Sequence, residues 1–186
     1  DKLDEIKERI ERLVETDLRV IKRILEEADE LIKENEKLIE KILRDNRRLI
    51  EEVEEIIRRD RDKRRLERIV EEVERRLDES TKELKKSSDR LTERLEELLE
   101  RSRRHSERID RTAKRLTEEL RDKVVQDEKK LRELKKRVDE LREESKDLND
   151  KLEKRIRDLK RELKKLNDRH EEELRKLKER LRRATK

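Results

Sequence analysis

The chain has 186 residues, of which 62% are charged, and it contains no Gly, Pro, Cys, Met, Phe, Tyr or Trp. The absence of cysteine excludes disulfides, thiolate nucleophiles and thiolate metal sites, and no apolar run exceeds two residues, which excludes a membrane-spanning helix. The 60 Lys and Arg residues are interleaved with 55 Asp and Glu residues, a pattern that predicts a solvated surface rather than a patch for nucleic acid. We therefore expect a soluble chain, cytoplasmic on expression, that binds no cofactor, nucleic acid or membrane.

Apolar residues in the first third of the chain recur every three or four positions, which is the spacing of one helix face. They stand at positions 3, 6, 10, 13, 20, 24, 28, 31, 38, 42, 49, 53 and 56. The pattern stops at "RRDRDKRR", residues 58–65, where a continued helix would lose two layers of its buried face. We predict a helix over about 2–59 and a turn over about 60–63, with Asp62 capping the next helix.

The apolar spacing resumes after this turn and predicts a second helix over about 64–122. Its end is less distinct, because the helical phase of the apolar positions changes little beyond Arg121. The β-branched pair Val124 and Val125, followed by Asp127 as a suitable N-cap, places a turn at about 123–127 and a third helix over about 128–184. Neither turn contains Gly, the usual residue at a helix end, so one uninterrupted helix, acting as a rigid single-helix spacer, is an alternative.

Three apolar stripes of nearly equal length predict an all-α fold. We expect a straight, antiparallel three-helix bundle of roughly 60-residue helices, forming a single domain over residues 1–186. In each stripe the apolar residues stay on the same side of a straight helix with about 3.6 residues per turn. A strict seven-residue repeat would instead move around the helix by about 20° per repeat and impose a supercoil, so we expect little supercoil.

Polar residues interrupt the stripes where leucine would be expected. The stretch "ERSRRHSERI", residues 100–109, contains three of them. With turns centred near residues 61 and 126, the level of each residue along the bundle follows by counting at about 1.5 Å per residue. The counting predicts three polar layers: Asp17 with Ser102, His105, Ser106, Ser145 and Asn149; Asn35 with Ser87, Ser88 and Asn167; and Asn46 with Ser80, Thr81 and His170.

These layers predict a role in structural specificity. A buried polar group without a partner costs about 1–3 kcal/mol, whereas groups at one level can satisfy each other. A slipped register would place them against leucine, so the layers would specify the register. We expect no catalytic and no metal-binding residue. His105 and His170 would lie roughly 35 Å apart, and Asp17, His105 and Ser106, although they are triad residue types, would sit in a closed interior without an oxyanion donor.

The absent residue types, the constant helical phase and the Ser, Thr, Asn and His layers together resemble de novo designed helical bundles with buried hydrogen-bond networks. The resemblance covers the whole chain, although the turns without Gly depart from the usual practice of that class. It implies a hyperstable scaffold that is not an enzyme and for which cellular localisation is not a meaningful property.

The first helix is predicted to have the widest apolar face. It carries 22 apolar residues, whereas the second and third carry 14 each. The excess lies in the adjacent pairs Leu13-Val14, Val20-Ile21, Ile24-Leu25, Leu31-Ile32, Leu38-Ile39, Ile42-Leu43, Leu49-Ile50 and Ile56-Ile57. Either this helix is the most enclosed one in a scaffold that needs no partner, or its extra edge joins copies of the chain into a homo-oligomer.

Overall fold

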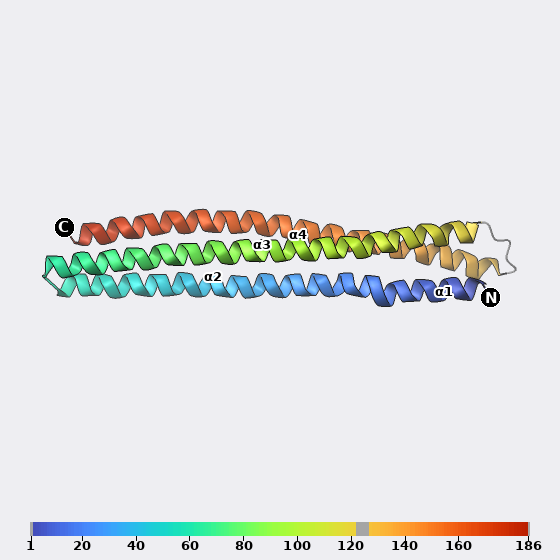
Figure 1. Ribbon diagram of the computed structural model, residues 1–186, viewed down its shortest axis with the longest axis horizontal. Coiled ribbons are helices and arrows are strands. Elements are labelled where there is room, and N and C mark those ends of the chain that lie inside the picture. Colours follow the sequence, from blue (N-terminus) through green and yellow to red (C-terminus); the bar gives the residue numbers. More distant parts are fainter. Residues whose placement is uncertain (1, 122–126, 186) are drawn as a thin grey trace. The chain divides into compact units, whose positions relative to one another are not determined.

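The computed structural model describes residues 2–121 and 127–185. In chain order the elements are α1 (Lys2–Leu13), a π-helical segment (Val14–Leu18), α2 (Arg19–Arg59), α3 (Lys63–Arg121) and α4 (Glu128–Ala184) (Figure 1). These described ranges contain no strand. None of their helices combines the length and the apolar character that crossing a membrane requires.

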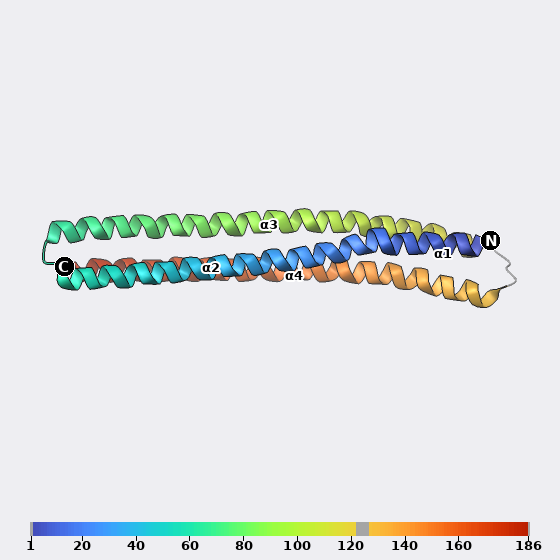
Figure 2. The ribbon, with the colours of Figure 1, turned by 90° about the horizontal axis from the view of Figure 1, so that it is seen from below.

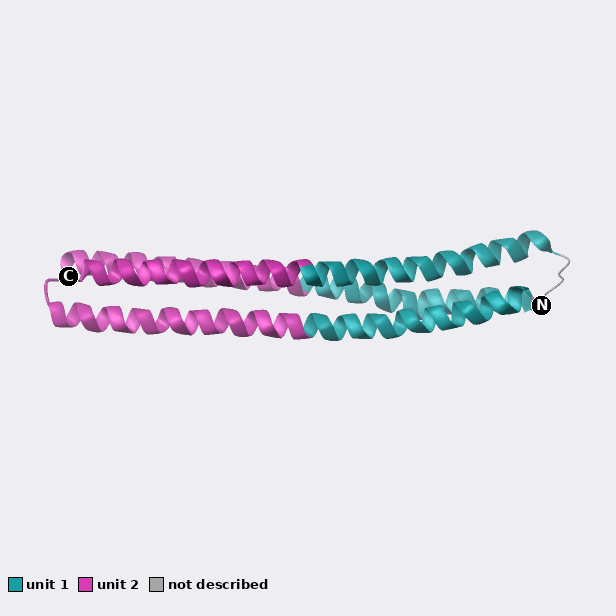
Figure 3. Ribbon diagram, turned by 90° about the horizontal axis from the view of Figure 1, so that it is seen from above, with its two compact units in different colours: residues 1–30, 94–157 teal, residues 31–93, 158–186 magenta. Residues whose placement is uncertain are grey.

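Contacts divide the chain into two compact units, each built from three helical segments (Figure 3). Unit 1 comprises residues 1–30 and 94–157, and unit 2 comprises residues 31–93 and 158–186. Within each unit the segment from α3 runs antiparallel to the other two, as two perpendicular views show (Figures 1 and 2). The predicted all-α, antiparallel three-helix bundle is confirmed. The single domain over residues 1–186 stays a prediction.

The first turn lies between Arg59 and Lys63, and hydrogen bonds from backbone N–H groups to two aspartate side chains stabilise it. The Oδ1 atom of Asp60 accepts a hydrogen bond from the backbone N–H of Asp62 at 3.1 Å, and Oδ1 of Asp62 accepts one from the N–H of Arg64 at 3.2 Å. Asp62 therefore caps α3, as the sequence predicted. No described residue has a positive φ, so the chain turns here without the left-handed conformation that favours Gly. The alternative of one uninterrupted helix is wrong.

The second turn separates α3 from α4. Helix α3 ends at Arg121 and α4 begins at Glu128, and Oδ1 of Asp127 accepts a hydrogen bond from the N–H of Lys130 at 3.1 Å. This is the N-cap that the sequence predicted. The rest of the predicted turn, including Val124 and Val125, lies outside the described residues.

Each unit has its own aliphatic core. In unit 1, Ile21, Leu116 and Leu141 are buried in one cluster that draws on all three segments. In unit 2, Leu77 and Leu181 are fully buried in a second cluster that also includes residues of α2. Burying one such side chain contributes roughly 1.5–3 kcal/mol before the loss of chain entropy.

The apolar face of α2 is centred one residue away from the positions that the sequence stripe gave. Ile21, Ile32, Ile39, Ile50 and Ile57 are buried. By contrast, positions 20, 31 and 49 are only half-buried, and Leu38 and Ile56 are 38% and 43% exposed. Asn35 and Asn46 also lie on the buried face. A stripe drawn from apolar residues alone leaves both positions out, so it does not show which member of each adjacent apolar pair faces the core.

Candidate functional site: three buried polar layers

The first polar layer lies in unit 1 and is centred on the carboxylate of Asp17, which is 3% exposed. Oδ1 of Asp17 lies 2.7 Å from Nδ1 of His105 and 3.6 Å from a guanidinium nitrogen of Arg108. Asp17 stands in the π-helical segment, where the additional residue in the turn allows both Asp17 and Leu18 to be buried. The sequence analysis missed this segment. The only available signal was Leu18, an apolar residue outside the predicted stripe.

Two further hydrogen bonds complete this layer, and both join α3 to α4. The hydroxyl of Ser145 donates to Oγ of Ser106 at 2.8 Å, and the hydroxyl of Ser102 donates to the side-chain carbonyl of Asn149. Ser102 and Ser145 are fully buried. No hydrogen bond joins Ser106 to His105 within the described ranges. The residue types of a hydrolytic triad are therefore present without the contact between nucleophile and base that the chemistry requires.

The second polar layer lies in unit 2 and contains one pair of bonded side chains. The hydroxyl of Ser87 on α3 donates to Oδ1 of Asn35 on α2 at 2.7 Å. Ser88 is also buried, but its Oγ has no hydrogen-bond partner, and its backbone carbonyl accepts a bond from the hydroxyl of Thr92 at 2.9 Å. Asn167 on α4 is half-buried. The structure thus joins α2 to α3 at this level and leaves Ser88 unsatisfied.

The third polar layer, also in unit 2, repeats this arrangement. Nδ2 of Asn46 donates to Oγ of Ser80 at 2.9 Å, whereas the hydroxyl of Thr81 donates to the backbone carbonyl of Leu77 within α3. His170 is 4% exposed, and neither ring nitrogen has a hydrogen-bond partner. Burial lowers the pKa of His170, against the opposing effect of the carboxylates of Glu173 and Glu171. The imidazole is therefore neutral at pH 7.

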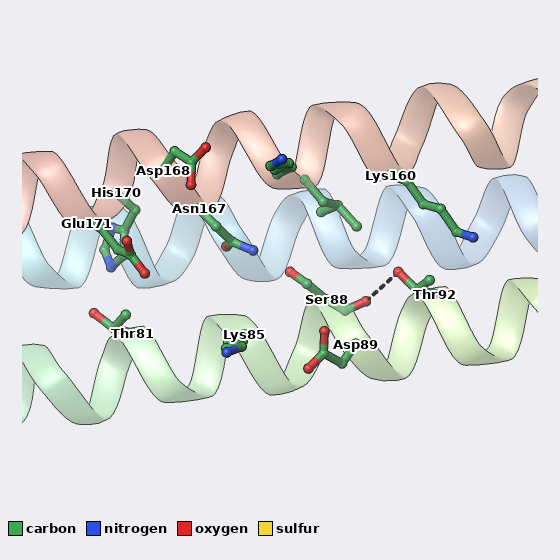
Figure 4. A pocket seen from close by; sticks show the side chains of 12 residues that line it. Thr81, Lys85, Ser88, Asp89, Thr92, Lys160, Asn167, Asp168, His170 and Glu171 are labelled. Carbon is green, nitrogen blue, oxygen red and sulfur yellow. Dashed lines mark hydrogen bonds between the residues drawn. The ribbon is translucent and has the colours of Figure 1, made fainter.

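The four predicted layer residues without an interhelical bond share one location. Thr81, Ser88, Asn167 and His170 all line a single pocket of unit 2 with a volume of about 330 Å³ (Figure 4). Across residues 2–121 and 127–185, no group of three or more His, Asp or Glu side chains is arranged to hold a metal ion.

Ion pairs surround the layers on the bundle surface, and sequence reasoning did not assign them. In unit 1, Arg142 on α4 lies 2.5 Å from Asp110 on α3 and lowers the pKa of that carboxyl group. In unit 2, Arg180 on α4 lies 2.6 Å from Glu54 on α2. An exposed pair such as Arg142 with Asp110 contributes about 0–1 kcal/mol. The second pair is partly buried, because the side chain of Glu54 is only 12% exposed.

Comparison with solved structures found a chain that is similar over 99% of this chain and 87% of its own length, with 21% sequence identity and a TM-score of 0.45. That chain is described as a computationally designed three helix bundle. This is the class of protein that the sequence itself resembles. No protein-family model and no curated protein matches the chain.

Proposed function

We propose that this chain is a structural scaffold of the designed type, without enzymatic activity, and that its buried polar layers specify the register of its helices. The hydrogen bond between Asn35 and Ser87 is the observation that carries the proposal, because it joins two helices through a side chain that is 7% exposed. The bond between Asn46 and Ser80 acts in the same unit and between the same helices.

The spacing of these two hydrogen-bonded pairs makes a slip of α3 along α2 unfavourable. The two asparagines are 11 residues apart, whereas the two serines are 7 apart. A slip of seven residues would bring Asn35 level with Ser80, but it would leave Asn46 beside Val73. An unsatisfied buried amide costs about 1–3 kcal/mol. The opposite slip of seven residues would bring Asn46 level with Ser87 but leave Asn35 beside Arg94. Neither slip by about two helical turns satisfies both asparagines, so the observed register is favoured over them.

The test is a distance measurement between α2 and α3. Because the chain has no Cys, spin labels can be attached specifically after Lys41→Cys and Lys82→Cys, two exposed positions of unit 2. The parent chain should give one narrow distance distribution by pulsed electron paramagnetic resonance. Replacing both pairs (Asn35→Leu, Asn46→Leu, Ser80→Ala and Ser87→Ala) should add further distances without loss of helical content.

Lys33→Leu is the matched control, because it adds a leucine at an exposed position of α2 and should leave the distance unchanged. If the variant without either pair keeps the single parent distance, the register does not depend on these layers. We also expect a thermal midpoint above about 60 °C by circular dichroism, as befits an idealised bundle.

A second candidate function is self-assembly, favoured by the exposed edge of α2 in unit 2. Leu38 is 38% exposed and Ile56 is 43% exposed. Glu34 and Lys41 lie on either side of Leu38 and have no ion-pair partner among the described residues. An antiparallel second copy centred on Leu38 would place each Glu34 within one residue of the level of a Lys41, so charges of opposite sign would lie near each other across the edge.

Light scattering with refractive-index detection tests this second function, since the chain has no aromatic residue for absorbance. Assembly predicts a mass that is a multiple of 23.2 kDa and that falls to a single chain after Leu38→Glu but not after Lys33→Glu at the outward-facing control position. A single-chain mass at every concentration would contradict assembly through this edge.

A further inference from the structure

Unit 2 buries two polar side chains that form no hydrogen bond with any described residue. His170 on α4 and Ser88 on α3 are each 4% exposed, and both imidazole nitrogens and the serine Oγ lack hydrogen-bond partners. Buried oxygens of Asp29 and Glu54 also lack a hydrogen bond, but each lies in an ion pair with an arginine. Burying a polar group without a partner is costly, so the surroundings of His170 and Ser88 require an explanation.

Both side chains line the same pocket, which has a volume of about 330 Å³. Figure 4 shows His170 and Asn167 projecting from α4 on the side where α3 carries Thr81 and Ser88. A water molecule in the liquid occupies about 30 Å³. The pocket therefore has room for a cluster of waters or for one small organic molecule together with waters.

The charge of the pocket disfavours an ion as the occupant. Its lining contains three lysines and three carboxylates, namely Lys85, Lys160, Lys164, Asp89, Asp168 and Glu171. These charges balance, so neither an anion nor a cation gains a net attraction. The described residues also offer no cluster of His, Asp and Glu that could hold a metal ion.

The unsatisfied groups favour an occupant that both donates and accepts hydrogen bonds. A neutral imidazole donates from one nitrogen and accepts at the other, and the hydroxyl of Ser88 and the amide of Asn167 can each do both. The ring of His170 is neutral at pH 7 because burial lowers its pKa. A molecule that could only donate or only accept would leave at least one of these groups unsatisfied.

We propose that this pocket is a binding site for a neutral hydrogen-bonding molecule, either water or a small carboxamide, held by His170, Ser88 and Asn167. The site does not depend on the register function proposed above, which rests on Asn35, Asn46 and their serine partners. An unchanged helix register in the earlier experiment would leave this proposal standing, and a dry pocket would leave the register proposal standing.

Nuclear magnetic resonance on the full, ¹⁵N-labelled chain tests the site. The chain has only two histidines, so the variant His105→Gln assigns the ring signals of His170. The first measurement looks for cross-peaks between the ring protons of His170 and water. The second follows both rings during a titration with acetamide, with His105 as the internal reference.

We expect water cross-peaks at His170, and saturable shifts with acetamide that spare His105 if the site accepts a carboxamide. Ser88→Ala should weaken the acetamide response several-fold. Ser145→Ala, the same change at a fully buried serine of unit 1, should leave it unchanged. Water cross-peaks without an acetamide response identify water as the occupant. Shifts that also depend on Ser88 identify a carboxamide site. The absence of both signals overturns the proposal.

Discussion

The two units both bury polar side chains in a three-helix core, but they satisfy them differently. In unit 1, the buried side chains of Asp17, Ser102 and Ser145 all bond to a residue of a neighbouring helix. In unit 2, Asn35 and Asn46 are bonded across helices, whereas Ser88 and His170 line a pocket and their side-chain polar atoms have no hydrogen-bond partner among the described residues. Polar residues at one level of a bundle are therefore not necessarily paired, because pairing also depends on which direction each side chain takes.

The two histidines show this difference most clearly. His105 is half-buried and lies against a fully buried carboxylate, whereas His170 is more deeply buried and has no hydrogen-bond partner among the residues that the structure describes. If the partner decides the energetic role of the residue, the same substitution should have opposite effects at the two positions.

The largest expected effect is a loss of stability in unit 1. His105→Leu removes the closest partner of Asp17 and leaves its carboxylate with the more distant guanidinium of Arg108. Removing one partner of a buried pair should lower the free energy of unfolding by about 3 kcal/mol. Guanidinium denaturation followed by circular dichroism measures this. The double variant Asp17→Leu/His105→Leu should recover most of the loss, since no isolated charge then remains, and a loss that persists would point to packing instead.

The second effect should have the opposite sign and occurs in unit 2. His170→Leu replaces an imidazole that has no hydrogen-bond partner among the described residues with an aliphatic side chain. An occupant of the pocket returns only the hydrogen bonds that the ring makes to water in the unfolded chain, so the variant should raise the free energy of unfolding by up to about 1–2 kcal/mol. His170→Gln, which keeps a buried polar group, should give no such gain. A His170→Leu variant that is less stable than the parent would show that the ring is well satisfied, and the contrast between the two histidines would then fail.

A smaller effect should come from the neutral pairs of unit 2. Ser80→Ala removes the acceptor of the Asn46 amide and should cost about 1 kcal/mol, because one neutral hydrogen bond is lost. Ser87→Ala, which removes the donor to Asn35, should cost a similar amount. A cost as large as that of His105→Leu in unit 1 would remove the distinction between charged and neutral layers.

The smallest effect should be a dependence of the free energy of unfolding on pH, caused by His170 in unit 2. Burial holds the pKa of His170 below its ordinary value of 6.5, so below that pH the unfolded chain binds a proton more readily than the folded chain. The stability should therefore be constant above about pH 6.5, fall as the pH drops below it, and level off below the folded-state pKa. Denaturation between pH 8 and pH 5 should show this slope in the parent and a reduced slope in His170→Leu. Equal slopes would mean that other groups titrate.

Much of the fold followed from the sequence because helical periodicity and capping residues are local signals. The loss of apolar residues near Asp60 located the first turn, and Asp62 and Asp127 act as the predicted caps. Counting residues from the turns also placed Asn35 level with Ser87, whose side chains are hydrogen-bonded. Such counting works because each helical residue advances the chain by a fixed amount of about 1.5 Å.

Other features could not be obtained in this way. The π-helical segment at Asp17 depends on how the neighbouring helices pack around the carboxylate. The only sign of it in the sequence is Leu18, an apolar and buried residue outside the predicted stripe. The choice between Leu38 and Ile39 as the buried member of their pair depends on the helix face that packs inwards. Adjacent residues differ by about 100° around a helix, and an apolar stripe wide enough to include both residues does not show which of them is buried.

The amino-acid sequence by itself determined the class of fold, the positions of the helices and the level of each polar residue along them. These properties follow from composition and from the geometry of a single helix. Tertiary structure alone decided that Asp17 contacts His105 while His170 lies unpaired beside a pocket. A hydrogen bond forms only within a few tenths of an ångström of its preferred length and with suitable angles, and that precision is set by the packing of three helices together.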